Sequence, residues 1–114
     1  MSDFQDFLKH EQAHVVIGEF KPGCFCEAQQ LYNKAVATYR EGFKEALLLR
    51  EPGSERGISI ILWDSVDHMD EQQRSDTHQA ILKQMTPLFT QQPHNEIYEL
   101  ASHITAAEKQ PAMV

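Results

Sequence analysis

The order of apolar and polar positions divides the chain into four short apolar segments and two longer amphipathic ones. The short segments are rich in β-branched or large apolar residues, and they predict strands over 14–20, 43–50, 57–63 and 96–104. The longer segments repeat apolar residues every three to four positions, which predicts two helices with one apolar face each. The first stripe comprises Ala28, Leu31, Tyr32, Ala35, Val36 and Tyr39, and the second comprises His78, Ile81, Leu82, Met85, Leu88 and Phe89.

Turn-forming and capping residues mark the ends of these segments. The Glu-Pro-Gly-Ser sequence at 51–54 joins the second and third strands as a hairpin. Gly42 is expected just beyond the C-terminus of the first helix, and Pro87 is expected to end or kink the second, which begins near Ser75. Asp64 or Ser65 is expected to cap a further short helix.

The resulting order, β-α-β-β-α-β, predicts an α+β fold of the ferredoxin-like kind. Such a fold is a four-stranded antiparallel sheet with both helices on one face. We expect this domain to span 12–104, after an N-terminal strap or short helix over 1–11 and before a flexible C-terminal tail over 105–114.

Two of the strands lack the alternation expected of a sheet that is covered on one side only. Residues 15–17 (VVI) are all apolar, and so are residues 60–62 (IIL). Both faces of these strands should therefore be buried, whereas the helices can cover only one. We expect the other face to meet the sheet of a second copy in a homodimer. Cover by the N-terminal strap and the tail is the alternative.

Composition narrows the class of protein. The 114 residues fit one domain, with 10 Lys and Arg against 17 Asp and Glu, for a formal net charge of −7. Nucleic-acid binding needs clustered cations and is disfavoured, as is attraction to anionic membranes. The sequence contains neither a signal-peptide pattern nor an apolar run of bilayer length, so we expect a cytoplasmic protein.

Over about residues 12–104 the chain resembles the antibiotic biosynthesis monooxygenase domains of the dimeric α+β barrel superfamily. The resemblance rests on HVVIGEFKPG before the first helix, on Gly42-Phe43 at the second strand, on Trp63 in LWDSVDHMDEQQRSDTH, and on MTPLF at 85–89. It implies a homodimer with a pocket between the sheet and the helices of each subunit. It also implies that Trp63 lies near that pocket.

The activity implied by this resemblance is that of a monooxygenase which oxidises a small aromatic or quinol substrate with dioxygen and uses no cofactor. Two alternatives remain open on the same scaffold: a non-catalytic homodimer that binds a small molecule, and a related isomerase or decarboxylase. The haem-degrading branch of the superfamily fits poorly. Its pocket tryptophan and the ligand histidine about ten residues later would fall near Gln72 and Leu82, and the nearest histidine is His78.

His78 is the candidate catalytic residue. It continues the apolar stripe of the second helix and should therefore face the sheet. An imidazole that titrates near neutrality can deprotonate a phenol, and the resulting anion can pass an electron to dioxygen. The alternative is a histidine at the edge of the core that bonds to a backbone carbonyl.

Four further residues are candidates for binding the substrate. Trp63 could stack on a flat ring or simply fill the core, and the hydroxyls of Tyr32 and Tyr39 could bond a substrate oxygen or only accompany core packing. His14 is in phase with Gly18 along the first strand. A glycine inside a strand marks the close approach of another group, either a pocket or a neighbouring side chain.

The cysteines and the other histidines add little. Cys24 and Cys26 lie at the start of the first helix, where a thiol becomes more reactive; a redox or nucleophilic role is one interpretation and a partly buried pair is the other. The histidines are scattered without the spacing of a metal site, so we expect no metal. They are His10, His14, His68, His78, His94 and His103.

Overall fold

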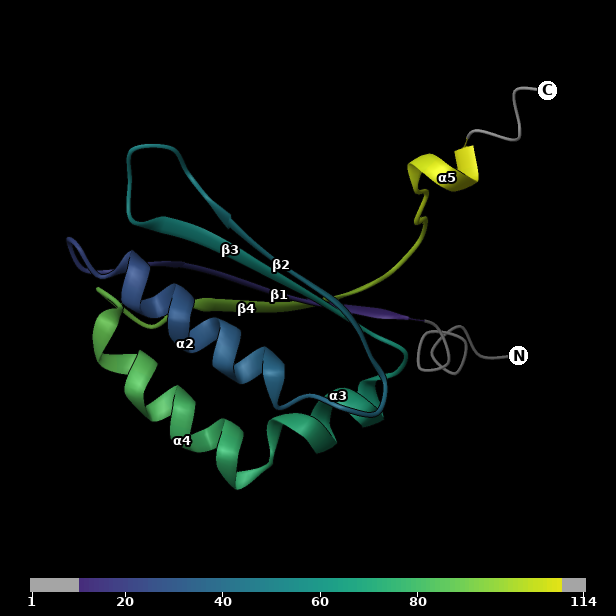
Figure 1. The fold of residues 1–114 in the computed structure, drawn as a ribbon, viewed down its shortest axis with the longest axis horizontal. Coiled ribbons are helices and arrows are strands. Elements are labelled where there is room, and N and C mark those ends of the chain that lie inside the picture. Colours follow the sequence, from purple (N-terminus) through teal and green to yellow (C-terminus); the bar gives the residue numbers. More distant parts are fainter. Residues whose placement is uncertain (1–10, 110–114) are drawn as a thin grey trace.

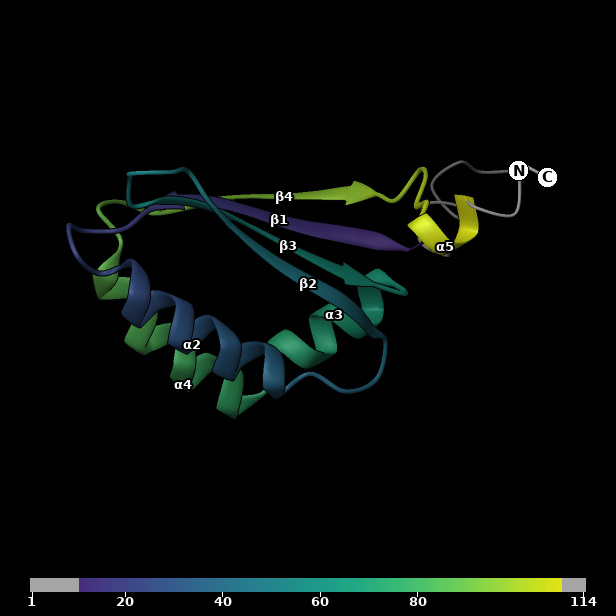
Figure 2. The ribbon, with the colours of Figure 1, turned by 45° about the horizontal axis from the view of Figure 1, so that its top comes forward.

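The computed structural model describes residues 11–109 and has the predicted α+β architecture. Its elements are β1 (Gln12–Glu19), α2 (Phe25–Ala37), β2 (Phe43–Arg50), β3 (Arg56–Trp63), α3 (Val66–Gln73), α4 (Asp76–Met85), the 3-10 turn η1 (Thr86–Leu88), β4 (His94–Glu99) and α5 (Ala106–Lys109). The strands form one antiparallel sheet in the order β2-β3-β1-β4. Helices α2, α3 and α4 lie on one side of it (Figures 1 and 2).

The register of the sheet explains the two apolar runs in the sequence. β1 and β3 are the central strands, and Val15 lies opposite Ile60 while Val16 lies opposite Ser59. Residues on alternate positions point to opposite faces, so Val16 and Ser59 face the helices, whereas Val15 and Ile60 face away. The apolar runs at 15–17 and 60–62 therefore place apolar side chains on both faces of the two central strands.

Serine caps begin two of the helices; the sequence predicts Asp64 or Ser65 as the first cap and only the approximate start of the second helix, near Ser75. The hydroxyl of Ser65 accepts a hydrogen bond from the backbone N–H of His68 at 3.2 Å, and that of Ser75 accepts one from His78 at 3.1 Å. The predicted end of the second long helix is also confirmed, because α4 stops at Met85 and Pro87 lies in the 3-10 turn that follows.

The cap of α2 is supplied from a distant segment. Glu55, in the turn between β2 and β3, accepts a hydrogen bond from the backbone N–H of Phe25 at 3.0 Å. Arg50 holds the other carboxylate oxygen of Glu55 at 2.8 Å. This bond satisfies one of the free N–H groups of the first helical turn and fixes α2 against the β2–β3 hairpin.

Two predicted boundaries are wrong. Helix α2 ends at Ala37 and is capped by Thr38, so Gly42 does not follow the helix directly. Gly42 instead precedes β2 with φ +86°, and a Cβ there would lie 2.4 Å from that of His68. The last strand ends at Glu99 rather than at 104, and Glu99 pairs with Gln12, the first residue of β1.

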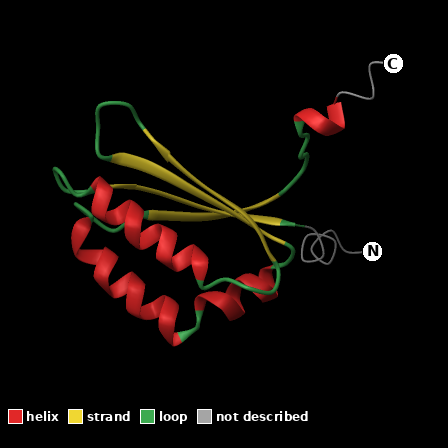
Figure 3. Ribbon diagram, viewed as in Figure 1, coloured by secondary structure: helices red, strands yellow, loops and turns green. Residues whose placement is uncertain are grey.

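The segments outside the domain are only partly described. The predicted N-terminal strap falls, apart from residue 11, outside the described residues, as do the last five residues of the predicted tail. Helix α5 lies within that tail and apart from the other helices (Figure 3). Within residues 11–109, no helix combines the length and apolarity needed to cross a membrane.

Two aromatic clusters pack between the sheet and the helices. The phenylalanine cluster comprises Phe20, Phe25 and Phe89, and its members lie near the start of α2 and the end of α4. The tyrosine–tryptophan cluster comprises Tyr39, Phe43 and Trp63 and lies toward the other end of the layer, near α3. The candidate site lies between these two clusters.

Candidate functional site

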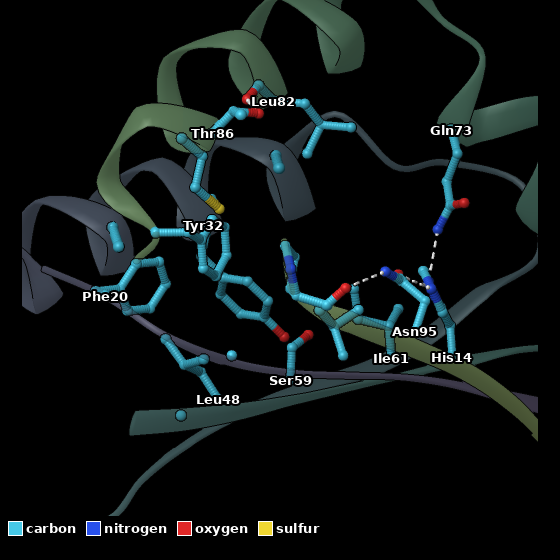
Figure 4. Close-up of a pocket in the computed structure, with 18 of the residues that line it drawn as sticks. His14, Phe20, Tyr32, Leu48, Ser59, Ile61, Gln73, Leu82, Thr86 and Asn95 are labelled. Carbon is cyan, nitrogen blue, oxygen red and sulfur yellow. Dashed lines mark hydrogen bonds between the residues drawn. The ribbon is translucent and has the colours of Figure 1, made fainter. Parts of the chain in front are cut away.

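A cavity of about 760 Å³ separates the inner face of the sheet from α2 and α4 (Figure 4). All four strands contribute to its wall, together with both long helices and the segment between η1 and β4. Its volume is in the range of sites that hold small organic ligands. The wall has two chemically different halves.

The apolar half is lined by Phe20, Ala28, Leu48, Met85 and Phe89. The rings of Phe20 and Phe89 stack with centroids 4.4 Å apart. Gly18 makes this stack possible, since a Cβ at Gly18 would lie 2.6 Å from Cε1 of Phe89. Two occupants were expected beside Gly18, a pocket or a neighbouring side chain, and the side chain of Phe89 takes most of that space. Gly18 also borders the cavity.

In the polar half, His14 lies between two side-chain amides (Figure 4). Its Nδ1 is 2.9 Å from Nε2 of Gln73, and its Nε2 is 3.0 Å from Oδ1 of Asn95. The amide nitrogen of Gln73 can only donate, so Nδ1 accepts and the ring proton is on Nε2, which donates to Asn95. Burial lowers the pKa of His14, while Asn95 and the charge of Asp70 act in the opposite direction. These bonds hold the ring as one neutral tautomer.

His78 and Tyr39 form a buried pair in the same half of the wall. Nε2 of His78 lies 2.8 Å from the hydroxyl oxygen of Tyr39, and the two residues are 4% and 6% exposed. Burial lowers the pKa of His78, and the nearby His14 adds to this, whereas the backbone of Gln73 opposes it. Burial also raises the pKa of Tyr39 far above its ordinary value. Both groups are therefore neutral at pH 7.

Tyr32 borders the cavity from α2. Its hydroxyl donates to the backbone carbonyl of Leu47 at 3.0 Å, which leaves the oxygen able to accept a hydrogen bond. Burial raises the pKa of Tyr32, and the side chain of Ser59 acts in the opposite direction. Ser59 lies on β3 and also lines the cavity.

Trp63 does not line the cavity, so it cannot contact a ligand there directly. The side chain is fully buried at 0% exposure, and its ring lies 4.7 Å from that of Tyr39 and 5.9 Å from that of Phe43. It is therefore behind the cavity wall, because the ring of Tyr39 covers it. Among the described residues, its indole N–H has no hydrogen-bond partner. Of the two interpretations that the sequence leaves open for Trp63, the packing against Tyr39 corresponds to filling of the core.

The structure brings together four of the five residues singled out from the sequence: His14, Tyr32, Tyr39 and His78 all line the cavity. Sequence reasoning missed Ser59, Gln73 and Asn95. Ser59 could have been found as the polar residue within an apolar strand. Gln73 and Asn95 carry no local signal, since their importance comes from their contact with His14.

The cysteines lie away from this wall. Both thiols are free; Cys24 packs against the phenylalanine cluster and Cys26 is exposed. Within residues 11–109, no group of three or more His, Cys, Asp or Glu side chains has the arrangement of a metal site.

By sequence, neither a protein family nor a curated protein matches the chain. Solved structures do match. A candidate antibiotic biosynthesis monooxygenase from Caulobacter crescentus superposes with a TM-score of 0.76 at 16% identity, over 88% of this chain and 98% of that one. SnoaB, a cofactor-independent oxygenase from Streptomyces nogalater, matches with a TM-score of 0.74 at 16% identity, over 83% and 97%.

A conserved protein from Methanosarcina mazei is also similar, with a TM-score of 0.72 at 20% identity, over 86% of this chain and 98% of that one. These similarities confirm the prediction that this chain has the same fold as the antibiotic biosynthesis monooxygenases. At such low identity they describe the scaffold alone, and a function has to be argued from the cavity.

Proposed function

We propose that the protein is a cofactor-independent monooxygenase that oxidises a small phenol or quinol with dioxygen. The observation that carries this proposal is the buried Tyr39–His78 pair on the wall of a half-apolar cavity. The apolar half suits an aromatic ring, and the pair suits a hydroxyl group on that ring. The fold shared with a cofactor-independent oxygenase supports the proposal.

The chemistry needs a neutral base that is ready at physiological pH. Burial lowers the pKa of His78, so its imidazole is neutral and can take up a proton. Once a phenol has lost its proton, the phenolate passes an electron to dioxygen much more readily. One oxygen atom then enters the substrate and the other leaves as water. The substrate supplies the electrons, so no separate reductant is consumed.

The other polar groups of the wall are placed to orient the substrate. Tyr32 can accept a hydrogen bond from a ligand hydroxyl while it donates to Leu47. His14 donates to Asn95 and accepts from Gln73, so it fixes the positions of both amides. We assign substrate binding to Tyr32 and Tyr39 directly and to His14 through the amides of Gln73 and Asn95, with Trp63 acting indirectly through Tyr39.

Oxygen uptake tests the proposal. The purified protein would be incubated with a panel of hydroquinones and polycyclic phenols beside two variants, His78→Gln and His94→Gln. His94 is an exposed histidine on β4 and serves as the matched control. We expect protein-dependent uptake that falls about a hundredfold or more in His78→Gln and stays unchanged in His94→Gln.

The other outcomes are equally informative. No uptake above the uncatalysed rate for any phenol would reject the oxygenase. Uptake that is retained in His78→Gln would keep the enzyme and reject this site. Turnover that continues without oxygen would instead indicate an isomerase or decarboxylase.

A non-catalytic binding protein is the second candidate. One observation favours it: both ring nitrogens of His14 are already bonded within the protein, as in a rigid binding wall. A small molecule that co-purifies with the protein and is never converted would support this function over the oxygenase.

We also propose that two copies associate through the outer faces of their sheets. That face carries Val15, Ile17, Ile58 and Ile60 on the central strands, together with Leu47 and Leu49 on β2. Leu47 and Leu49 are 42% and 47% exposed, which is a large apolar exposure for one strand. A second copy offers an identical apolar face of matching size and twist.

Light scattering after size-exclusion chromatography tests this association. We expect a dimer that becomes a monomer in the Leu47→Glu/Leu49→Glu variant. Leu82→Glu is the control, because Leu82 is an exposed leucine on α4, on the opposite side of the sheet. A monomeric wild-type protein would contradict the proposal.

A further inference from the structure

We infer that Tyr39 is the group that meets the substrate hydroxyl and that His78 takes up the proton through it. This inference rests on the proposed function and assigns the roles within its site. In it, Tyr39 is the catalytic residue and His78 is a positioning residue and proton acceptor.

The first argument is that neither nitrogen of His78 is open to the cavity. Nε2 is occupied by the hydroxyl of Tyr39 at 2.8 Å. Nδ1 is buried and, among the described residues, has no hydrogen-bond partner. A ligand on the wall can therefore reach the imidazole only through the phenol of Tyr39.

The second argument concerns the direction of the hydrogen bond. Of the two groups in contact, the phenol is the stronger hydrogen-bond donor and the imidazole nitrogen is the stronger acceptor, so the shared proton stays on the hydroxyl of Tyr39 and the ring proton of His78 is on Nδ1. Nε2 then carries a lone pair and accepts from the hydroxyl of Tyr39. In this arrangement the phenol oxygen of Tyr39 keeps a lone pair that can accept a hydrogen bond from a substrate hydroxyl.

The third argument is that the phenol ring is held in place. Its centroid lies 4.7 Å from that of Trp63 and 5.7 Å from that of Phe43, and both rings are tilted against it. The ring centroid of His78, on α4, lies 5.4 Å from that of Tyr39. A ring held by three neighbouring rings keeps its hydroxyl in one position, which preorganises it for proton transfer to Nε2 of His78. This gives Trp63 a role in the site without contact to the ligand.

The proton transfer balances without another reactant. The O–H bond of the substrate breaks and its proton goes to the hydroxyl oxygen of Tyr39. At the same time the O–H bond of Tyr39 breaks and its proton goes to Nε2 of His78. The products are a substrate phenolate, a neutral Tyr39 and a His78 imidazolium, and no electron moves in this step.

The probe for this step is 4-nitrophenol, whose anion is yellow and whose neutral form is not. Equilibrium dialysis measures how much probe the protein binds, and absorbance measures how much of it is ionised. We expect the bound probe to be ionised by the wild-type protein at a pH where the free probe is largely neutral. In Tyr39→Phe and in His78→Gln the ionised-to-neutral ratio should fall about tenfold, equal to one pKa unit.

Two variants serve as matched controls. Tyr98 is an exposed tyrosine on β4 whose hydroxyl bonds to Glu96, and His94 is exposed on the same strand. Tyr98→Phe and His94→Gln should ionise the bound probe as the wild-type protein does. Both control variants remove the same chemical groups as the test variants but leave the cavity intact.

Three outcomes would overturn the inference. Ionisation that persists in Tyr39→Phe and disappears in His78→Gln would show that His78 takes the proton directly. Ionisation that persists in both variants would remove the pair from the step. Failure of the wild-type protein to bind or ionise the probe would reject the phenol site itself.

A second measurement needs no variant, in case Tyr39→Phe does not fold. The nitrogen-15 chemical shifts of His78 in the wild-type protein should change to those of an imidazolium when the probe binds. A ring that stays neutral while the probe ionises would overturn the inference. Neither measurement requires oxygen, so ionisation of the probe without any oxygen uptake would reject the proposed oxygenase and leave the proton relay standing.

Discussion

The two halves of the cavity wall are held together in different ways. In the apolar half, Phe20 stacks on Phe89 at 4.4 Å and meets Phe25 edge-on at 5.5 Å, so contact between rings holds it. In the polar half, hydrogen bonds link side chains from different elements, as in the Tyr39–His78 pair. Buried apolar rings contribute far more to stability than single hydrogen bonds do. The apolar half thus stabilises the fold, and the polar half carries the chemistry.

The largest effect should come from the apolar half. Phe25 is 4% exposed, and the guanidinium of Arg50 lies 4.5 Å from its ring centroid. Truncation in Phe25→Ala removes a buried ring and leaves a cavity, so the free energy of unfolding should fall by about 3–5 kcal/mol. Denaturant titration measures this change. A loss below about 1 kcal/mol would mean that the phenylalanine cluster does not hold the layer together.

Overpacking of the same half should have the next largest effect. A Cβ in Gly18→Ala would lie 2.6 Å from the ring of Phe89, which must move. We expect a loss of about 1–3 kcal/mol in the free energy of unfolding. The double variant Gly18→Ala/Phe89→Leu should recover part of it, because the smaller side chain leaves room. Simple additivity of the two losses would contradict the proposed contact.

Removing a hydrogen bond from the polar half should lower the free energy of unfolding less than either change in the apolar half. Tyr39→Phe keeps the ring packed against Trp63 and removes one hydrogen bond to His78. We expect the free energy of unfolding to fall by about 1 kcal/mol, measured by the same titration. If Tyr39→Phe lowered the free energy of unfolding as much as Phe25→Ala does, the division between a stabilising half and a chemical half would be wrong.

The smallest effect should be a dependence of stability on pH. In the folded protein, burial lowers the pKa of both His14 and His78 below the ordinary value of 6.5. The unfolded chain therefore binds more protons as the pH falls through 6.5, and the free energy of unfolding should decrease there. The decrease should be weaker in His14→Gln and in His78→Gln, and unchanged in His94→Gln.

His68 changes the pH dependence of stability in the opposite direction, and its contribution can be measured separately. Its bond to Asp64, at 2.6 Å, raises the pKa of His68. The stability that this bond contributes is present below pH 6.5 and is lost as the pH rises through the raised pKa. Denaturation measured on both sides of pH 6.5, with His68→Gln as a further variant, distinguishes the two contributions. A slope below pH 6.5 that disappears in His68→Gln would contradict the assignment to His14 and His78.

Much of the fold could be predicted because its signals are local. The second strand has the predicted bounds, 43–50, and the first and third agree within two residues. The fourth strand was predicted too long, since the apolar pattern continues to Ile104 while the pairing partner, β1, begins at Gln12. The end of a strand depends on its neighbour, and a neighbour is not encoded in the strand's own pattern.

The sequence by itself determined the order of the elements and placed Tyr32 and His78 on the inner faces of their helices, since helical and strand periods are properties of a few adjacent residues. Tyr39 was predicted on the first helix as well, but it lies just beyond the end of α2. Only the tertiary structure decided that Tyr39 lies at the cavity wall with Trp63 behind it. It also decided which polar groups meet in the cavity. Those contacts depend on distances between separate elements, and side-chain packing across the layer sets such distances.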